Sequence, residues 1–159
     1  MTVIAYKDGV LAADRACCNR GMMIATTTMI WRTPHGCLVG VAGSSLDASA
    51  VKAWSDGDLP SIIAPDFNFP AMRSQDTEAM VIMPNGDCML FCGGQNGNFP
   101  VLDRHPFIAT GSGMDLALGA MAAGVSAVDA TLIACRIDIH CGGGVDWLDV
   151  HGNGGRIDA

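Results

Sequence analysis

The sequence predicts a single domain of the α+β class, in which antiparallel strands form a sandwich and helices pack against it. Short apolar runs separated by Asp-Gly, Asn-Gly or Pro-containing turns are typical of β-hairpins. The helical segments are grouped after residue 44 and after residue 113, and they do not alternate with strands as parallel βαβ units require. The chain has 159 residues, of which 50% are hydrophobic. A chain of this size buries about 70% of its unfolded surface without needing disulfides.

The first 43 residues predict two hairpins. Residues 3–5 and 10–13 are apolar runs on either side of an Asp-Gly pair, which favours a tight turn. Residues 26–32 (TTTMIWR) and 37–43 (CLVGVAG) are rich in strand-forming side chains and flank the turn TPHG. We therefore expect about four strands before residue 44.

The first helix is predicted to begin at a pair of serines that can cap it and to end near Gly57. Leu46, Ala50 and Trp54 fall on one face of this segment at helical spacing. The chain then carries prolines at regular intervals, which are Pro60, Pro65 and Pro70. Because proline interrupts a helix, we expect an irregular connection there.

Three further strands are predicted in the second half of the chain. Residues 78–83 (EAMVIM) and 88–93 (CMLFCG) flank the turn PNGD, which is another hairpin signal. Residues 106–110 (PFIAT) then lead into the glycine-containing turn GSG. This order, strand followed by a glycine turn, favours a helix directly after it.

Two Ala-rich helices and a last strand complete the predicted domain. One of these two helices begins near Met114. The other begins at Ser126, where an Asp three residues later gives the spacing of a capping box. Residues 142–150 end in a strand. We therefore expect one domain over residues 1–150 and a loose tail over 151–159, because HGNGGRIDA is rich in glycine and polar residues.

Charge and cysteine content narrow the function classes. The 16 acidic residues outnumber the 9 basic ones, the net charge is −7, and the two lysines, Lys7 and Lys52, stand apart. This argues against a nucleic-acid partner. No apolar run approaches the roughly 20 residues that span a bilayer, so we expect a cytoplasmic protein with no membrane partner. The seven cysteines show no repeated CxxC pairing and mostly sit in apolar runs, which indicates buried free thiols.

Thr2 is the first candidate for chemistry. When the initiator Met1 is removed, Thr2 becomes the amino terminus. Its α-amine, whose ordinary pKa is about 8, can then act as general base toward its own hydroxyl. A Met-Thr start is common, however, and has no functional meaning by itself.

Four short motifs later in the chain contain further candidates. LAAD ends in Asp14, VAGS contains Gly43, ATGSGMD contains Ser112, and DIHCGG contains Asp138 and Cys141. Each has an ordinary explanation, as a strand-end carboxylate, a turn glycine, a helix cap or a solvated carboxylate. The adjacent His and Cys of DIHCGG lack partners at metal-ligand spacing, so we expect no metal and no cofactor.

The order and separation of these motifs resemble the N-terminal-nucleophile (Ntn) hydrolases of the proteasome β-subunit and HslV type. The resemblance covers nearly the whole chain and is strongest to the short phage-borne and bacterial members. It implies a four-layer αββα sandwich, with two antiparallel sheets between layers of helices. It also implies that Thr2 attacks a peptide carbonyl and that an N–H near Gly43 stabilises the oxyanion. The other site residues implied by the resemblance are Asp14, Ser112, Asp138 and Cys141.

The resemblance further implies an assembly. Members of the family form rings of six or seven subunits, which can stack in pairs and hide the sites from folded proteins. We therefore expect the chain to associate with copies of itself and to take polypeptide as its substrate. An unfolding ATPase is an optional partner, and an origin in a bacterium or a phage stays open.

Two departures from the family pattern leave the activity open. Members resembling this chain have a lysine in a pattern like TKIFR, whose ammonium assists the nucleophile, whereas TMIWR places Met29 there. Cys141 stands where serine is usual and is a weaker hydrogen-bond partner. Arg15 adjoins Asp14, but strand alternation points it to the opposite face. The chain is thus either an active threonine peptidase or a catalytically silent homologue that serves as a ring-forming structural or assembly protein.

Overall fold

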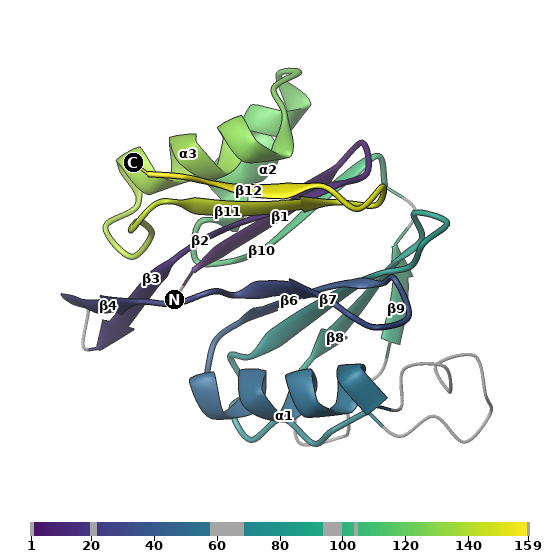
Figure 1. The fold of residues 1–159 in the computed structure, drawn as a ribbon. Helices are drawn as coiled ribbons and strands as arrows, with labels where there is room; N and C mark the ends of the chain where they lie inside the picture. Colours follow the sequence, from purple (N-terminus) through teal and green to yellow (C-terminus); the bar gives the residue numbers. More distant parts are fainter. Residues whose placement is uncertain (1, 20–21, 58–68, 94–99, 104, 159) are drawn as a thin grey trace.

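A computed structural model describes residues 2–19, 22–57, 69–93, 100–103 and 105–158, and these form a mixed α+β fold (Figure 1). The described strands form three antiparallel sheets, two with five strands and one with two. In Figure 1 the two larger sheets lie face to face, with one helix below the lower sheet and two helices above the upper one. The predicted α+β class with antiparallel hairpins is therefore confirmed.

The first five-stranded sheet has the order β10-β1-β2-β11-β12. Its strands are β1 (Val3–Lys7), β2 (Val10–Asp14), β10 (Phe107–Gly111), β11 (Val145–Asp149) and β12 (Gly154–Ile157). The predicted first hairpin is confirmed, since β1 pairs with β2 around Asp8 and Gly9. Both turn residues have positive φ, 51° and 80°, which is the geometry that tight hairpin turns require and that Asp-Gly supplies.

The second five-stranded sheet has the order β5-β6-β7-β8-β9. Its strands are β5 (Ile30–Arg32), β6 (Leu38–Ala42), β7 (Glu78–Ile82), β8 (Cys88–Cys92) and β9 (Pro100–Asp103). The hairpins predicted around TPHG and PNGD are confirmed as β5–β6 and β7–β8. β6 is buried along its whole length, because one face meets the other sheet and the opposite face meets a helix.

Three helices cover the outer faces of the sheets, namely α1 (Ser45–Gly57), α2 (Met114–Ala122) and α3 (Ala127–Ile137). The predicted helix start at Ser126 is confirmed, because Ser126 is the N-cap of α3: its hydroxyl accepts from the Asp129 N–H at 3.1 Å and donates to the Asp129 carboxylate at 2.8 Å. As predicted, α2 and α3 pack against each other. The predicted apolar face of α1 is confirmed at Trp54, which is buried, but it is wrong at Leu46 and Ala50, which are exposed; Val51 is buried in their place.

Three apolar clusters fill the space between these layers. The cluster between the two large sheets contains Ile4, Leu11, Ile30, Leu38, Met80 and Ile82. The cluster under α1 contains Val39, Val41, Val51, Trp54, Val81 and Phe91. The cluster under α2 and α3 contains Val3, Ala5, Ala12, Ala117, Met121 and Ala130. Alternate residues of β1, β2 and β6 therefore face different clusters, as the two-residue period of a strand requires.

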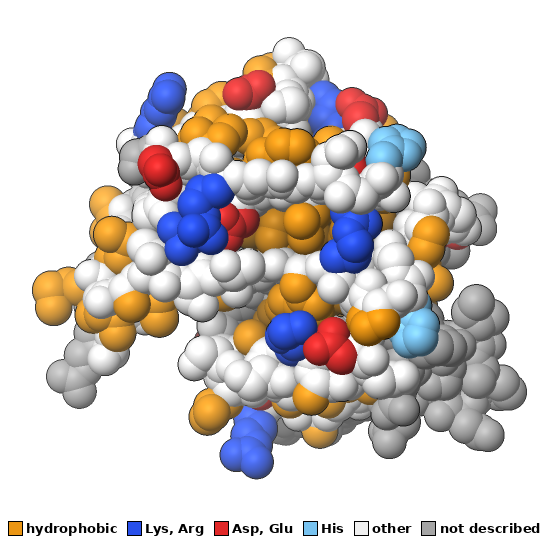
Figure 2. All heavy atoms as spheres, viewed as in Figure 1, with side chains coloured by type: hydrophobic (Ala, Val, Ile, Leu, Met, Phe, Trp, Pro, Cys, Tyr) orange, Lys and Arg blue, Asp and Glu red, His pale blue; other side chains and the backbone are white. Residues whose placement is uncertain are grey.

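Two expectations about chain organisation are wrong. The structure has six strands before residue 44 rather than about four, because β3 (Ala16–Asn19) and β4 (Met22–Thr26) form an additional hairpin. This hairpin extends beyond the sheets, and its apolar side chains gather on the left edge of the molecule in Figure 2. Met22, Met23 and Ile24 are all more than half exposed. A strand without a buried face shows no hydrophobic alternation, so the pattern missed it.

The loose tail predicted at residues 151–159 is wrong for Gly154–Ile157, which form β12. β12 pairs with β11, with Trp147 opposite Gly155. A Cβ on Gly155 would lie 2.9 Å from the Trp147 Nε1 atom, so glycine is needed for the strand to pass the indole. Most of the proline-rich connection, residues 58–68, lies outside the described part of the chain.

Candidate active site around Thr2

The β1–β2 hairpin brings Thr2 and Asp14 together. Thr2 directly precedes β1, Asp14 is the last residue of β2, and both residues are fully buried. The Thr2 hydroxyl donates a short hydrogen bond to Asp14 Oδ1. The Val3 N–H donates to the same oxygen at 2.9 Å. The two residues that the sequence singled out first thus make direct contact.

Two more donors reach the other oxygen of Asp14. The Gly142 N–H donates to Oδ2 at 2.8 Å, and the Ala16 N–H donates to it at 3.3 Å. Burial raises the pKa of Asp14, and the hydrogen bonds from Thr2 and from the three N–H groups offset this only in part. Among the described residues, no Lys, Arg or His lies within ion-pair distance of Asp14. Neutral donors alone therefore hold this carboxyl group.

Ser112 contacts the backbone of Thr2 from the other side. The Ser112 hydroxyl donates to the Thr2 carbonyl oxygen at 3.3 Å. It does not cap α2, whose N-cap residue is Gly113. The neighbouring Gly111 has φ +90°, and a Cβ there would lie 2.2 Å from the same carbonyl oxygen. The end of β10 must therefore be glycine for Ser112 to reach Thr2.

Asp138 and Cys141 continue the contacts from Ser112. The Cys141 sulfur lies 3.8 Å from the Ser112 hydroxyl oxygen, and its thiol donates to Asp138 Oδ2 at 3.3 Å. Burial alone would raise the pKa of Asp138, but hydrogen bonds, first from the His140 N–H and then from Cys141 and Ser112, outweigh it and lower that pKa. Burial raises the pKa of the Cys141 thiol. Cys141 is therefore a neutral hydrogen-bonding group at neutral pH and not a thiolate nucleophile.

Gly43 forms a turn that only glycine fits. Its φ is +123°, and a Cβ would lie 2.7 Å from the Thr77 Cα atom. Within the described residues, the Gly43 N–H meets no protein acceptor. The N–H of the next residue, Ser44, donates to the Thr77 hydroxyl oxygen at 3.1 Å. Gly43 lines the same pocket as Thr2, and a backbone N–H without a partner in a pocket is the kind of donor that can stabilise an oxyanion.

Thr2 is among the residues that line a pocket of about 570 Å³. The lining consists of Thr2, Ala42, Gly43, Ser44, Ser74, Gln75, Asp76, Glu78, Gly111 and Ser112. Glu78 was not among the site residues predicted from the sequence. It accepts hydrogen bonds from the Thr110 hydroxyl and, at 3.4 Å, from the Gly111 N–H. An acidic residue at the start of an otherwise apolar strand, EAMVI, is the signal that could have identified it.

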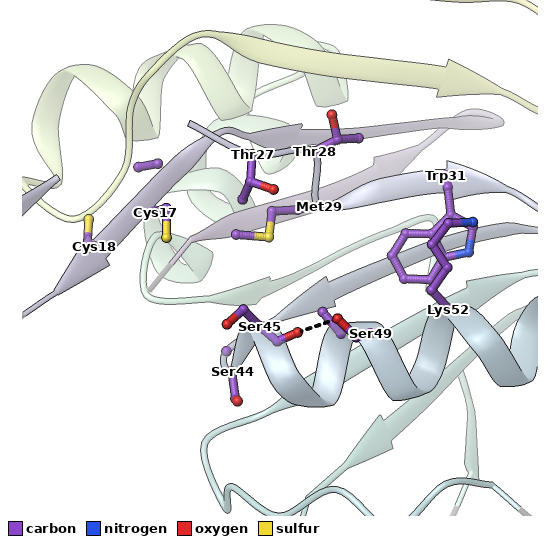
Figure 3. Close-up of a pocket in the computed structure, with 13 residues that line it drawn as sticks. Cys17, Cys18, Thr27, Thr28, Met29, Trp31, Ser44, Ser45, Ser49 and Lys52 are labelled. Atoms are coloured by element: carbon purple, nitrogen blue, oxygen red, sulfur yellow. Dashed lines mark hydrogen bonds between the residues drawn. The ribbon is translucent and has the colours of Figure 1, made fainter. Parts of the chain in front are cut away.

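Met29 lines a second pocket, of about 430 Å³, which shares Gly43 and Ser44 with the first (Figure 3). Met29 is buried and belongs to the cluster between the sheets. Figure 3 shows its thioether extending into the pocket between Thr27 and the start of α1. Lys52 lies over the Trp31 ring, 5.4 Å from its centroid, and pairs with Asp56 at 2.9 Å. The equivalence of Met29 to the family lysine stays a prediction.

Arg15 turns away from Asp14, as strand alternation predicts. Its Nε atom lies 3.4 Å from Asp146 Oδ2, and its Nη1 group donates to the Gly143 carbonyl at 3.4 Å. The Arg15 guanidinium therefore does not serve as a counter-ion for Asp14. It contacts instead the loop that carries Gly142, one of the donors to Asp14.

Comparisons with known proteins add no assignment to this geometry. In the described part of the chain, no group of three or more His, Cys, Asp or Glu side chains could hold a metal ion. None of the described helices has the length and apolar character needed to cross a bilayer. No protein-family model matches the sequence, and no curated protein shows significant similarity to it. The resemblance to Ntn hydrolases therefore rests on the motif residues and on the contacts that they make.

Proposed function

We propose that the protein is a threonine peptidase of the Ntn-hydrolase type, which cleaves peptide bonds with Thr2 after Met1 is removed. The observation that carries this proposal is the contact of the buried Thr2 hydroxyl with Asp14 beside a pocket large enough for substrate. The two facing sheets between helices are consistent with the αββα sandwich of that family. We take this layer order to be the Ntn-hydrolase fold.

The proposed reaction is an acyl transfer in two stages. The free α-amine of Thr2 takes the proton of the Thr2 hydroxyl as the oxygen attacks the substrate carbonyl carbon. The oxyanion that forms accepts a hydrogen bond from the Gly43 N–H. The C–N bond then breaks, the proton passes to the leaving amine, and an ester remains on Thr2. Water hydrolyses this ester in the second stage, with the α-amine again as base, and frees the hydroxyl.

The remaining site residues act by holding Thr2 in place. Asp14 accepts from the Thr2 hydroxyl and fixes its rotamer. Ser112 holds the Thr2 carbonyl at 3.3 Å, and Cys141 with Asp138 supports Ser112. The weaker thiol thus makes the contact that serine is expected to make in the family. A restrained nucleophile loses less entropy on reaching the attack geometry.

A second candidate function is a catalytically silent scaffold. Among the described residues no cation lies beside Asp14, and Met29 stands where the resemblance places a lysine. An acid-base group of this kind typically contributes about 10² to 10⁴ in rate, so its loss can leave negligible turnover. In both candidate functions the chain assembles with copies of itself into six- or seven-fold rings. Only the peptidase takes a polypeptide substrate and, optionally, an unfolding ATPase.

Mass spectrometry and peptide hydrolysis together test the proposal. The peptidase requires a chain that lacks Met1, and turnover of small fluorogenic peptides that Thr2→Ala abolishes and Thr2→Ser partly keeps. Thr26→Ala is the matched control, because Thr26 is exposed on β4 and should leave turnover unchanged. A chain that lacks Met1 and shows no turnover above that of Thr2→Ala would refute the peptidase and favour the scaffold.

A further inference from the structure

A buried carboxyl group on β11 joins three segments that surround the candidate site. Asp146 is 8% exposed. It accepts from Arg156 Nε at 2.7 Å and from the Thr28 hydroxyl at 3.1 Å, and it pairs with Arg15 Nε at 3.4 Å. These partners come from β12, from the segment that leads into β5, and from the residue after Asp14. Arg156 makes a charge-assisted hydrogen bond with this buried carboxylate, and Arg15 adds an ion pair without a hydrogen bond from its Nε atom.

Two of these three partners, Arg15 and Thr28, lie next to a residue of the site in the sequence. Arg15 follows Asp14, and its side chain also donates to the Gly143 carbonyl. The Arg15 N–H donates to the Gly142 carbonyl at 3.0 Å, while the Gly142 N–H donates to Asp14 at 2.8 Å. Arg15 therefore binds the carbonyl groups of the same loop whose Gly142 N–H binds Asp14. Thr28, the second partner, directly precedes Met29.

We propose that Asp146 is a positioning residue of the candidate site. Through Arg15 it holds the loop at Gly142 and Gly143 against Asp14, and through Thr28 it fixes the segment that carries Met29. Arg156 on the edge strand β12 fixes Asp146 in turn, so the last strand of the chain supports the nucleophile's carboxylate partner at a distance. The effect of Asp146 on catalysis rests on the proposed function, but the structural coupling between Asp146 and the Gly142 loop does not.

The titration of Asp14 separates this coupling from a direct charge effect. Asp146→Asn removes a negative charge near Asp14, which by electrostatics alone would lower the pKa of Asp14. If the loop is released instead, Asp14 loses the Gly142 N–H that lowers its pKa, so that pKa rises. Burial, and after it the charge of Asp14, raises the pKa of the Cys135 and Cys141 thiols, so both stay neutral while Asp14 titrates. The two explanations therefore predict shifts of opposite sign.

The experiment uses the full chain with ¹³C-labelled aspartate side chains and hydrogen–deuterium exchange. For Asp146→Asn we expect an upward shift of the Asp14 midpoint and at least about tenfold faster amide exchange around Gly142. Arg156→Gln should give the same changes with smaller size, and it tests the proposal even where Asp146→Asn fails to fold, because the Arg156 side chain is 48% exposed. Asp56→Asn, in an exposed ion pair on α1, is the control and should change neither quantity.

A downward or absent shift of Asp14 with unchanged exchange at Gly142 in the folded variants would overturn the proposal. Neither measurement needs turnover, so the coupling can hold where the peptidase assay fails. Conversely, turnover that Thr2→Ala abolishes, together with an unaffected Asp14 in Asp146→Asn, would keep the peptidase and refute the positioning role. In an active chain, we expect Asp146→Asn to lower kcat with little change in KM.

Discussion

Asp14→Asn removes up to half of the hydrogen bonds that Asp14 accepts in the candidate site. Each carboxylate oxygen of Asp14 accepts from two donors, and three of the four donors are backbone N–H groups. The amide of asparagine keeps one oxygen and replaces the other by an NH2 group. If that group faces Gly142 and Ala16, two buried N–H groups lose their acceptor. No rotation of the amide satisfies all four donors, because both oxygens are already in use.

The expected destabilisation follows from these two lost acceptors. Leaving a buried donor unsatisfied costs about 1 to 3 kcal/mol, which gives about 2 to 6 kcal/mol for two. The burial that raises the pKa of Asp14 disfavours its charge, and the neutral amide removes that penalty. We therefore expect the lower part of this range, about 2 to 4 kcal/mol. For a chain of this size, this corresponds to a fall in Tm of about 4 to 16 °C.

Thermal unfolding followed by circular dichroism measures this effect. Asp149→Asn is the matched control, because the Asp149 carboxylate also accepts from His151 and Asn153 N–H groups but is open to water. Water replaces the lost acceptor there, so we expect a Tm change of less than about 2 °C. A Tm for Asp14→Asn within the range of that control would show that the donors around Asp14 do not depend on its charge.

Further predictions concern individual site residues. Met29→Lys should raise turnover of fluorogenic peptides by a chain that lacks Met1, and unchanged turnover would refute its equivalence to the family lysine. Gly43→Ala should lower both Tm and turnover, because its Cβ would lie 2.7 Å from the Thr77 Cα atom; wild-type values would contradict the tight turn. The pKa of Asp138 is lower in the folded chain than its ordinary value of 3.8. Its carboxylate therefore stabilises the fold at pH values above 3.8, and this contribution is lost as the pH falls through the folded-state pKa. Asp138→Asn should therefore flatten acid unfolding there, and an unchanged acid-unfolding curve would exclude this role.

Local signals predicted the elements whose turns or caps are encoded by neighbouring residues. The Asp-Gly turn fixes the β1–β2 register, and that register brings Thr2 against Asp14. The capping pair at Ser126 likewise marks the start of α3. These features depend on contacts between residues close in sequence or joined by one tight turn, and such contacts leave a recognisable pattern.

Features that depend on distant contacts left no such pattern. The Gly142 N–H is a backbone group, so nothing in its side chain announces that it binds Asp14. Gly155 suggested a flexible tail, whereas its missing Cβ makes room for Trp147. The apolar side chains of β4 are exposed, so their burial could not indicate a strand. Glu78 enters the pocket only because β7 lies near the end of β10.

Labelling of Thr2 by an electrophilic peptide tests the central claim most directly. The purified full chain is treated with a peptide vinyl sulfone, and intact-mass and fragment spectra locate both Met1 and any adduct. We expect a chain that lacks Met1 and carries one adduct on Thr2, and no adduct on folded Thr2→Ala. A folded chain that lacks Met1 but stays unlabelled at Thr2, or an adduct that persists in Thr2→Ala, would contradict the assignment of Thr2 as the nucleophile.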